Sequence, residues 1–346
     1  MEQYKKEYEI QMEQVRFTKE GKENMMKRIK EKGKESKKGV NMAKYAGVAA
    51  CLCILSGTAY ATGILQPVSE IFAPIFGGSV AQTEIIDQIG RPLNASDTDK
   101  GVTITAEAII GDKNNVCVVF KVAQKDGSPL ELPDELVNEP AWHLDFWNAG
   151  IRIPVFGGSI GTTYFENSDD GHYRLIQMQT YDVDIPQGET VTASFEDLYY
   201  FSENGEKETL VKGNWDMKFQ LNYEDTSVYL DVNESFVRDG VNFTIDSIQV
   251  SPIGYLVNYT IDTVVKPVEF GGTSTSSQAE HQLYWAGIEL LFTLKDGTVL
   301  DCSNQSGGMA PKEDYILAHK SDIFDEIIPL EDIFSVTVGD VVVILE

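Results

Sequence analysis

Two stretches of this chain decide its fold: "NASDTDKGVTITAEAII" at residues 94–110 and "NESFVRDGVNFTIDSIQ" at residues 233–249. Each alternates apolar and polar residues on both sides of a turn that contains Gly, which is the pattern of a β-hairpin. A shift of 139 residues aligns them without gaps and gives six identities, including the Gly-Val pair after the turn. The next strand sequences, 116–122 and 255–261, keep the same register. We interpret these stretches as the opening hairpins of two related β-domains.

Short alternating runs separated by turn sequences continue to the C-terminus, for example at residues 172–185, 288–294 and 334–346. Helical sequence is sparse, and the candidates for short helices are "ELPDELVNE" at 131–139 and "HKSDIFDEI" at 319–327. Many short strands with regular turn signals are typical of all-β sandwiches. The sequence therefore predicts a mainly β fold.

Charge and hydropathy divide the chain near its N-terminus. Residues 1–44 hold 13 Lys and Arg against 8 Asp and Glu, whereas residues 45–346 hold 15 against 46. Between them Tyr45–Leu65 is a run of 21 uncharged residues, which as a helix spans about 31 Å, close to the hydrocarbon thickness of a bilayer. Basic residues flank the cytoplasmic end of a membrane helix. We therefore expect a single-pass membrane protein with its N-terminus in the cytoplasm.

This division predicts five segments in order: a basic helical segment (1–44), a transmembrane helix (45–65), a connector (66–81), and two tandem Ig-like β-sandwich domains outside the cytoplasm (82–212 and 213–346).

The apolar run has an alternative interpretation. Residues 42–63 carry a Lys, an apolar stretch and the small residues Ala59 and Ala61, as a cleaved signal peptide does. The 41 residues that precede Met42 favour a retained anchor, because signal peptides begin with a short basic region.

The sequence of the N-terminal segment predicts a helix that begins near Thr18. Phe17, Met25, Met26 and Ile29 are its apolar residues and the candidates for contact with a cytoplasmic partner. Two interpretations stay open: a basic tether near anionic lipid, or a docking helix that folds on its partner.

The sequence contains no arrangement typical of catalysis. Its four His are scattered, and the motifs of zinc proteases, serine hydrolases and phosphate-binding loops are missing from it. We predict no enzyme activity, no cofactor and no metal site. The oxygen-rich loop at Asn167, Asp169 and Asp170 allows weak Ca²⁺ binding, but the Asp-Gly sequence favours a hairpin turn.

Cys117 and Cys302 allow a disulfide outside the cytosol.

Several aromatic residues allow either a ligand groove or a hydrophobic core, and we interpret them as core: Trp142, Phe146, Trp147, Trp215, Tyr284 and Trp285. The acidic composition after residue 44 argues against nucleic acid, because phosphate contacts need clustered Lys and Arg.

The order of these parts resembles a family of Gram-positive bacterial membrane proteins described as anti-sigma-factor-like, with an extracytoplasmic domain of unknown function. The resemblance rests on "VRFTKEGKENMMKRIKEK" before the apolar run, on residues 93–122, and on "GNWDMKFQLNY" followed by residues 243–262. It implies a cytoplasmic segment that holds a sigma factor or passes a signal, and outer β-domains that sense or bind something. The chain departs from well-defined anti-sigma domains because its N-terminal segment has no His/Cys zinc set and only one short helix.

We therefore expect a membrane signalling protein, an anti-sigma factor by resemblance, that binds or senses at the cell envelope. The alternative is a surface-anchored binding or adhesion module whose basic tail only sets its topology.

Overall fold

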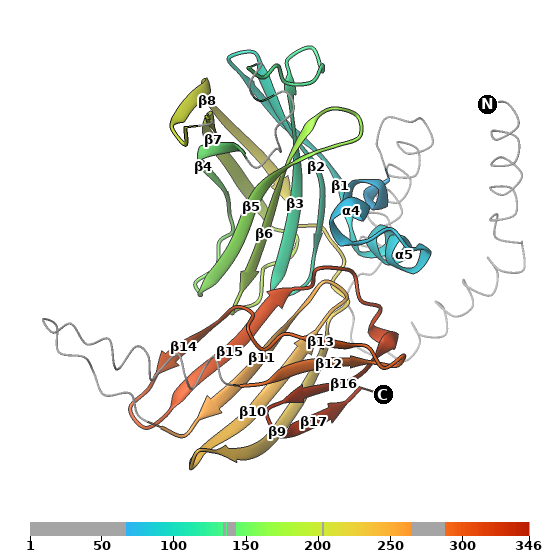
Figure 1. Ribbon diagram of the computed structural model, residues 1–346, viewed down its shortest axis with the longest axis vertical. Coiled ribbons are helices and arrows are strands. Elements are labelled where there is room, and N and C mark those ends of the chain that lie inside the picture. The colour runs from blue at the N-terminus through green and yellow to red at the C-terminus, as the bar shows by residue number, and fades with distance from the viewer. Residues whose placement is uncertain (1–66, 134–135, 137–142, 203, 264–287, 346) are drawn as a thin grey trace, which may run out of the picture. The chain divides into compact units, whose positions relative to one another are not determined.

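The computed structural model describes residues 67–133, 136, 143–202, 204–263 and 288–345, all of which belong to one compact unit, Thr62–Glu346 (Figure 1). These residues form a mainly β fold with four antiparallel sheets, as the alternating pattern predicts.

Eight strands, the N-terminal strand group, surround one hydrophobic core. A five-stranded sheet has the order β1-β2-β3-β6-β5 and a three-stranded sheet the order β4-β7-β8. Inward-facing side chains of both sheets, such as Phe120 and Trp215, belong to the same core cluster. The bounds are β1 Arg91–Asp99, β2 Val102–Gly111, β3 Asn115–Gln124, β4 Leu144–Arg152, β5 Ser159–Asn167, β6 Tyr173–Tyr181, β7 Thr190–Phe201 and β8 Lys207–Gln220.

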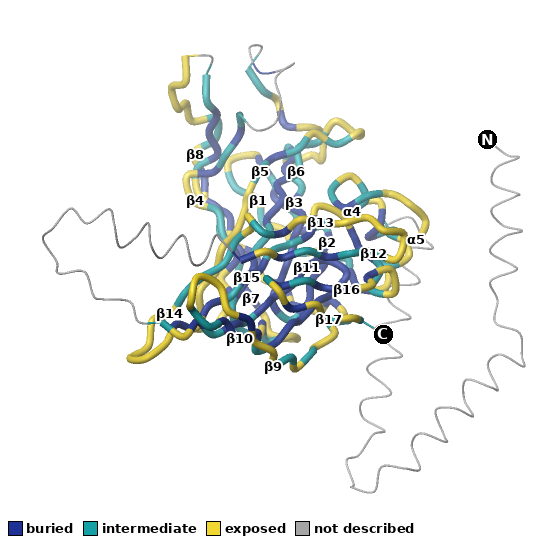
Figure 2. Tube along the Cα trace, turned by 60° about the horizontal axis from the view of Figure 1, so that its bottom comes forward, coloured by how far each residue is buried: buried dark blue, intermediate teal, exposed yellow. Residues whose placement is uncertain are grey.

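The remaining strands, the C-terminal strand group, surround a second core. Their sheets have the orders β14-β15-β11-β10-β9 and β13-β12-β16-β17. Figure 2 shows buried residues along the strands and exposed residues in many of the turns. The bounds are β9 Val228–Arg238, β10 Val241–Val250, β11 Gly254–Ile261, β12 Leu290–Leu294, β13 Val299–Asp301, β14 Gly307–Pro311, β15 Ile316–Ile323, β16 Ile333–Val338 and β17 Val341–Ile344, with the 3-10 helix η3 at Leu330–Asp332.

The structure confirms the internal repeat. A shift of 139 residues carries β2 onto β10 residue for residue, and β3 begins 139 residues before β11. The turns before β2 and β10 both place two residues at positive φ, Lys100 and Gly101 in one and Asp239 and Gly240 in the other. The register of each strand also shifts at the equivalent place, around Glu107 in β2 and Asp246 in β10.

Two helices that the sequence analysis missed precede the strands, α4 (Val68–Phe76) and α5 (Val80–Ile89). Figure 1 shows both helices beside the five-stranded sheet. Their apolar side chains pack against the outer face of that sheet, together with Ile253 and Ile327 of the C-terminal strand group. The predicted connector at 66–81 is therefore largely helical, and the first strand begins at Arg91 instead of residue 82.

Two further predictions are wrong. The predicted domain boundary between residues 212 and 213 falls inside β8, which pairs with β7 and places Trp215 in the first core. The predicted helix at 319–327 begins as strand β15, because residues 316–323 pair with β11. Most of the other predicted helix, 131–139, lies outside the described residues.

The two strand groups meet at equivalent positions of the repeat. Asp112 follows β2 and Ser251 follows β10, and the Ser251 hydroxyl donates a hydrogen bond to the Asp112 carboxylate. That carboxylate also accepts from the N–H groups of Asn114 and Asn115, each at 2.7 Å. The Gln249 side-chain amide donates to Asn114. This contact buries Asp112, which is 2% exposed.

The segments predicted to be cytoplasmic and transmembrane, 1–44 and 45–65, lie outside the described residues. Among the helices of the described part, none has the length and apolarity needed to cross a bilayer.

Candidate functional site

The structure leaves the predicted contact residues untested. Phe17, Met25, Met26 and Ile29 all lie outside the described residues. Trp142, Tyr284 and Trp285 lie outside them too. Of the other aromatic residues, Phe146 and Trp215 are in the first core, whereas Trp147 is 65% exposed and is not a core residue.

The oxygen-rich loop forms a hairpin turn between β5 and β6. Gly171 has a φ of 78°, and its N–H donates to the Ser168 carbonyl at 2.9 Å. The Asp170 carboxylate accepts hydrogen bonds from the Ser168 hydroxyl and the His172 N–H. Within the described residues, no group of three or more His, Cys, Asp and Glu is arranged to hold a metal ion.

Cys117 and Cys302 are both buried free thiols. Cys117 packs with the helices and Cys302 in the second core, so the structure does not contain the disulfide that the sequence allowed.

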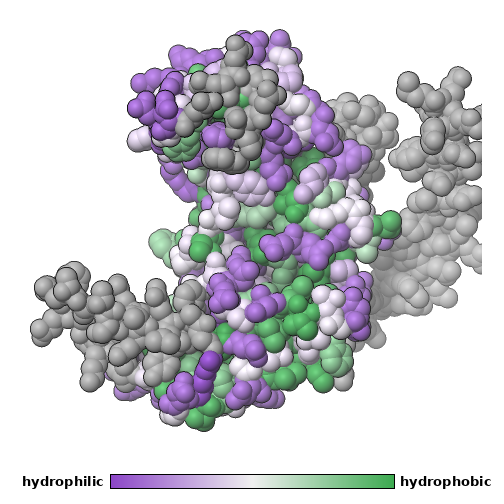
Figure 3. Space-filling view, viewed as in Figure 1, coloured by the Kyte–Doolittle hydropathy of each residue, from purple (hydrophilic) through white to green (hydrophobic). Residues whose placement is uncertain are grey.

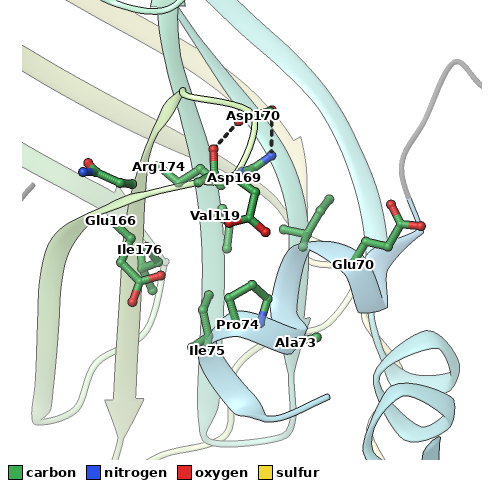
Figure 4. A pocket seen from close by; sticks show the side chains of 13 residues that line it. Glu70, Ala73, Pro74, Ile75, Val119, Glu166, Asp169, Asp170, Arg174 and Ile176 are labelled. Carbon is green, nitrogen blue, oxygen red and sulfur yellow. Dashed lines mark hydrogen bonds and ion pairs between the residues drawn. The ribbon is translucent and has the colours of Figure 1, made fainter. Parts of the chain in front are cut away.

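The candidate site is a cavity of about 450 Å³ between α4 and the β5–β6 hairpin, which we call the α4 pocket. Figure 4 shows that α4 contributes Glu70, Ala73, Pro74 and Ile75. Ile71 of α4 also lines the pocket. The rest of the lining comes from the outer face of the sheet and from the hairpin, namely Val119, Glu166, Asn167, Ser168, Asp169, Asp170, Arg174 and Ile176.

The sequence of α4 explains how it forms one wall. Val68, Ile71, Phe72 and Phe76 recur at helical spacing and are buried, so this face packs on the sheet and the opposite face is left for the pocket. Pro67 precedes the helix, and Gly77 ends it with a φ of 95°.

Hydrogen bonds fix α4 in this position. The N–H and hydroxyl of Ser69 donate to the Asp87 carboxylate of α5 at 2.8 and 2.9 Å. The Ile327 N–H donates to the Phe76 carbonyl at 2.9 Å, which attaches the end of α4 to the C-terminal strand group. The wall of the pocket is therefore held by hydrogen bonds with α5 and with the C-terminal strand group.

Carboxylates dominate the polar part of the pocket. Burial raises the pKa of Glu166 above its usual range. Partial burial also acts to raise the pKa of Asp170, but hydrogen bonds from Ser168 and His172 and the charge of Arg174 lower it to about 2. Arg174 is held at 2.7 Å from the Glu107 carboxylate, so its charge is shared with acidic residues of the sheet.

This arrangement suits a ligand with both an apolar part and a positive charge. Pro74, Ile75 and Ile176 offer apolar surface, and Glu70 and Glu166 offer carboxylates on different walls (Figure 4). Figure 3 likewise shows hydrophobic and hydrophilic side chains interspersed near the middle of one face.

Sequence reasoning missed this pocket because its two walls are far apart in the chain. The sequence of α4 predicts a connector, since Pro74 and two Gly interrupt the apolar pattern. The one available signal was the capping box of α5, in which Ser79 and Gln82 bond each other's backbone.

A comparison with known families matches the segment that contains α4. Residues 37–124 match DUF4179, described as a domain of unknown function. The match spans α4, α5 and β1 to β3, together with residues that precede the described part.

No curated protein matches the chain. Two solved structures are similar to it. A conserved domain protein from Bacillus anthracis is 15% identical with a TM-score of 0.47, over 72% of this chain and 76% of that one. The N-terminal periplasmic domain of ScsB from Proteus mirabilis is 10% identical with a TM-score of 0.19, over 72% of this chain and 94% of that one.

Proposed function

We propose that this chain is a single-pass membrane signalling protein whose outer part binds a ligand in the α4 pocket. Its two strand groups act as Ig-like β-sandwich domains outside the cytoplasm. Residues 14–40 contact a cytoplasmic partner, for which a sigma factor is our first candidate, and the chain itself is not an enzyme.

The observation that carries this proposal is the position of α4. The uncharged run ends at Leu65, and α4 begins at Val68 and lines the pocket with Glu70 and residues 73–75. A ligand in the pocket would therefore contact the first folded element after the proposed membrane helix. If α4 can adopt two positions, a ligand that binds more tightly to the protein in one of them shifts the equilibrium toward that position.

Charge supports the proposed orientation. The excess of Lys and Arg lies before the run, and residues 66–90 contain no Lys or Arg. An isolated helix of the length expected for residues 18–32 is marginal in water, so in this proposal residues 14–40 fold when they bind their partner.

The first experiment tests the anchor. The full chain with a C-terminal tag is expressed in a Gram-positive host and fractionated, and the mass of the tagged product is measured. A full-length product in the membrane supports the proposal. A product that begins near Thr62 in the medium contradicts it, because the N-terminal segment would then be removed.

The second experiment tests signalling through α4. Ala73→Trp fills the pocket from α4, and Val80→Trp adds the same ring at an exposed position of α5 that is not among the pocket residues. We expect Ala73→Trp to change transcription of a set of genes and Val80→Trp to leave it unchanged.

A third variant scrambles residues 14–40 at constant charge in the full chain. The signalling proposal predicts loss of the transcriptional response and loss of the protein captured by this segment. If scrambling changes neither, the chain is a surface-anchored binding or adhesion module instead.

A further inference from the structure

Three aromatic rings surround one ammonium group on the outer face of the three-stranded sheet. The Lys207 Nζ lies 3.7 Å from the ring centroid of Tyr199, 4.6 Å from that of Trp147 and 5.7 Å from that of Phe201. All three distances are within the range of cation–π attraction. We call Trp147, Tyr199 and Phe201 the aromatic cage.

The strand register brings these residues together. Tyr199 and Phe201 are two apart in β7, so both face the same side of the sheet. Phe201 pairs with Lys207 of β8, and Tyr199 pairs with Asp145 of β4, two residues before Trp147. The rings of Tyr199 and Phe201 meet edge to face, with centroids 5.4 Å apart and planes at 85°.

Tyr199 forms the buried side of the cage, its floor, and Trp147 forms the exposed side, its open wall. Tyr199 is 5% exposed, and its hydroxyl donates a hydrogen bond at 2.7 Å to the Asp145 carboxylate. Burial and this carboxylate raise the pKa of Tyr199 to about 12, so the phenol keeps its proton at neutral pH. Trp147, by contrast, is 65% exposed, so part of its ring is accessible to a molecule from solution.

The negative charge of Asp145, next to Tyr199, favours binding of a cation in the cage. Asp145 accepts a hydrogen bond from the Tyr199 hydroxyl, and a phenol that donates to a carboxylate gains electron density in its ring. The attraction between a ring face and a cation is electrostatic, so this arrangement strengthens it. Neither Tyr199 nor Trp147 belongs to the first core, which lies on the other face of the sheet.

We propose that the aromatic cage binds a trimethylammonium group of the choline type, and that Lys207 occupies the cage when this ligand is absent. A lysine ammonium is strongly hydrated and sits on a flexible four-carbon stem, so it leaves the cage at low cost. A quaternary ammonium has no N–H groups to hydrate and is the cation that aromatic cages bind well. This inference is independent of the α4 pocket, whose lining shares no residue with the cage.

The test uses the full chain in detergent and measures binding of choline phosphate by titration calorimetry. Trp147→Ala removes the open wall, and we expect it to weaken binding at least about threefold. Lys207→Ala removes the internal competitor, and we expect it to tighten binding at least about threefold. Phe334→Ala truncates an exposed aromatic residue of β16 and is the matched control, which we expect to bind like the parent chain.

The Lys207→Ala result decides the proposal, because a tighter complex cannot arise from misfolding. Unchanged or weaker binding by this variant overturns the role of Lys207, and equal losses in Trp147→Ala and Phe334→Ala overturn the cage. Failure of the parent chain and of Lys207→Ala to bind the probe overturns the proposal as a whole.

A second titration identifies the source of the group. Short-chain phosphatidylcholine is compared with phosphatidylglycerol of the same acyl length, and each is competed with choline phosphate. Tighter binding of phosphatidylcholine than of choline phosphate identifies a lipid headgroup, and equal binding identifies a soluble or polymer-linked choline phosphate. Equal binding of both lipids contradicts recognition of the trimethylammonium group.

Discussion

At the scale of single residues, Lys320 is unusual because it is a charged residue that is fully buried. It lies in β15, is 1% exposed, and donates a hydrogen bond from its Nζ to the Ser303 carbonyl. Burial lowers its pKa to about 8, because a charged ammonium loses its hydration there. Keeping this charge at neutral pH therefore costs the folded state free energy.

This cost predicts a pH dependence. In the unfolded chain the lysine keeps its proton until about pH 10.5, whereas the folded chain releases it near pH 8. Between these values the unfolded state binds more protons, so the free energy of unfolding rises with pH. We expect Lys320→Met to be more stable than the parent at pH 7, by at most about 3 kcal/mol, and to lack this rise.

Urea unfolding of the full chain at pH 7 and pH 9.5 measures both effects. Lys218→Met, at an exposed position of β8, is the control and keeps the pH dependence of the parent. A rise of equal size in Lys320→Met and in the parent would show that another group causes it.

At the scale of elements, the two repeated hairpins depend on the same turn chemistry. Gly101 and Gly240 have φ values of 84° and 80°, and each follows another residue at positive φ. Such turns match the right-handed twist of the paired strands, which is why Gly is favoured there. An added Cβ would meet no atom within 4 Å at either position, so only backbone strain opposes a larger residue.

We therefore expect Gly101→Ala and Gly240→Ala each to lower the free energy of unfolding by about 1 kcal/mol. Gly150→Ala in β4 is the matched control, because it also has open space around its Cβ position but no positive φ. Denaturant unfolding of the three variants gives the comparison. Equal losses in all three would contradict strain at the turns.

The sequence predicted the wrong secondary structure where tertiary contacts stabilise the element. β15 occupies residues 316–323 and overlaps the predicted helix at 319–327, because pairing with β11 on one edge and β14 on the other outweighs local preference. In the same way α4 is a short helix with an internal Pro that packs on a sheet, and local sequence preference alone does not indicate it.

At the scale of the whole molecule, the two strand groups are joined through equivalent positions of the repeat. The Asp112 carboxylate is buried and accepts from Asn114, Asn115 and Ser251. Burial raises its pKa, and these hydrogen bonds oppose that rise. Removing the carboxylate leaves buried donors without an acceptor, which costs about 1–3 kcal/mol for each.

A double-mutant cycle tests this connection. We expect Asp112→Ala to lower the free energy of unfolding by about 3 kcal/mol or more, and Asp112→Ala and Ser251→Ala together to lose less than the sum of the two single variants. The exposed pair Asp126 and Ser128, which has the same kinds of groups within one turn, is the control cycle. Strictly additive losses at Asp112 and Ser251 would show that this contact does not couple the two groups.

The sequence by itself determined the β character of the chain, the position of most strands and the internal repeat. These follow from alternation along the strand and from Gly-containing turns, both of which are local properties. It also determined the division of charge around residues 45–65, from which the proposed topology follows.

Only the tertiary structure decided the features that could bind ligands. The α4 pocket needs α4 to pack on a sheet face whose residues lie up to about 100 positions away, and the aromatic cage needs the register of β4, β7 and β8 to turn Trp147 outward. Asp112 likewise has the sequence context of an ordinary turn residue, and its hydrogen bond with Ser251, 139 residues away, is formed only in the tertiary structure. Long-range packing and register set these contacts, and neither is encoded in any single stretch of sequence.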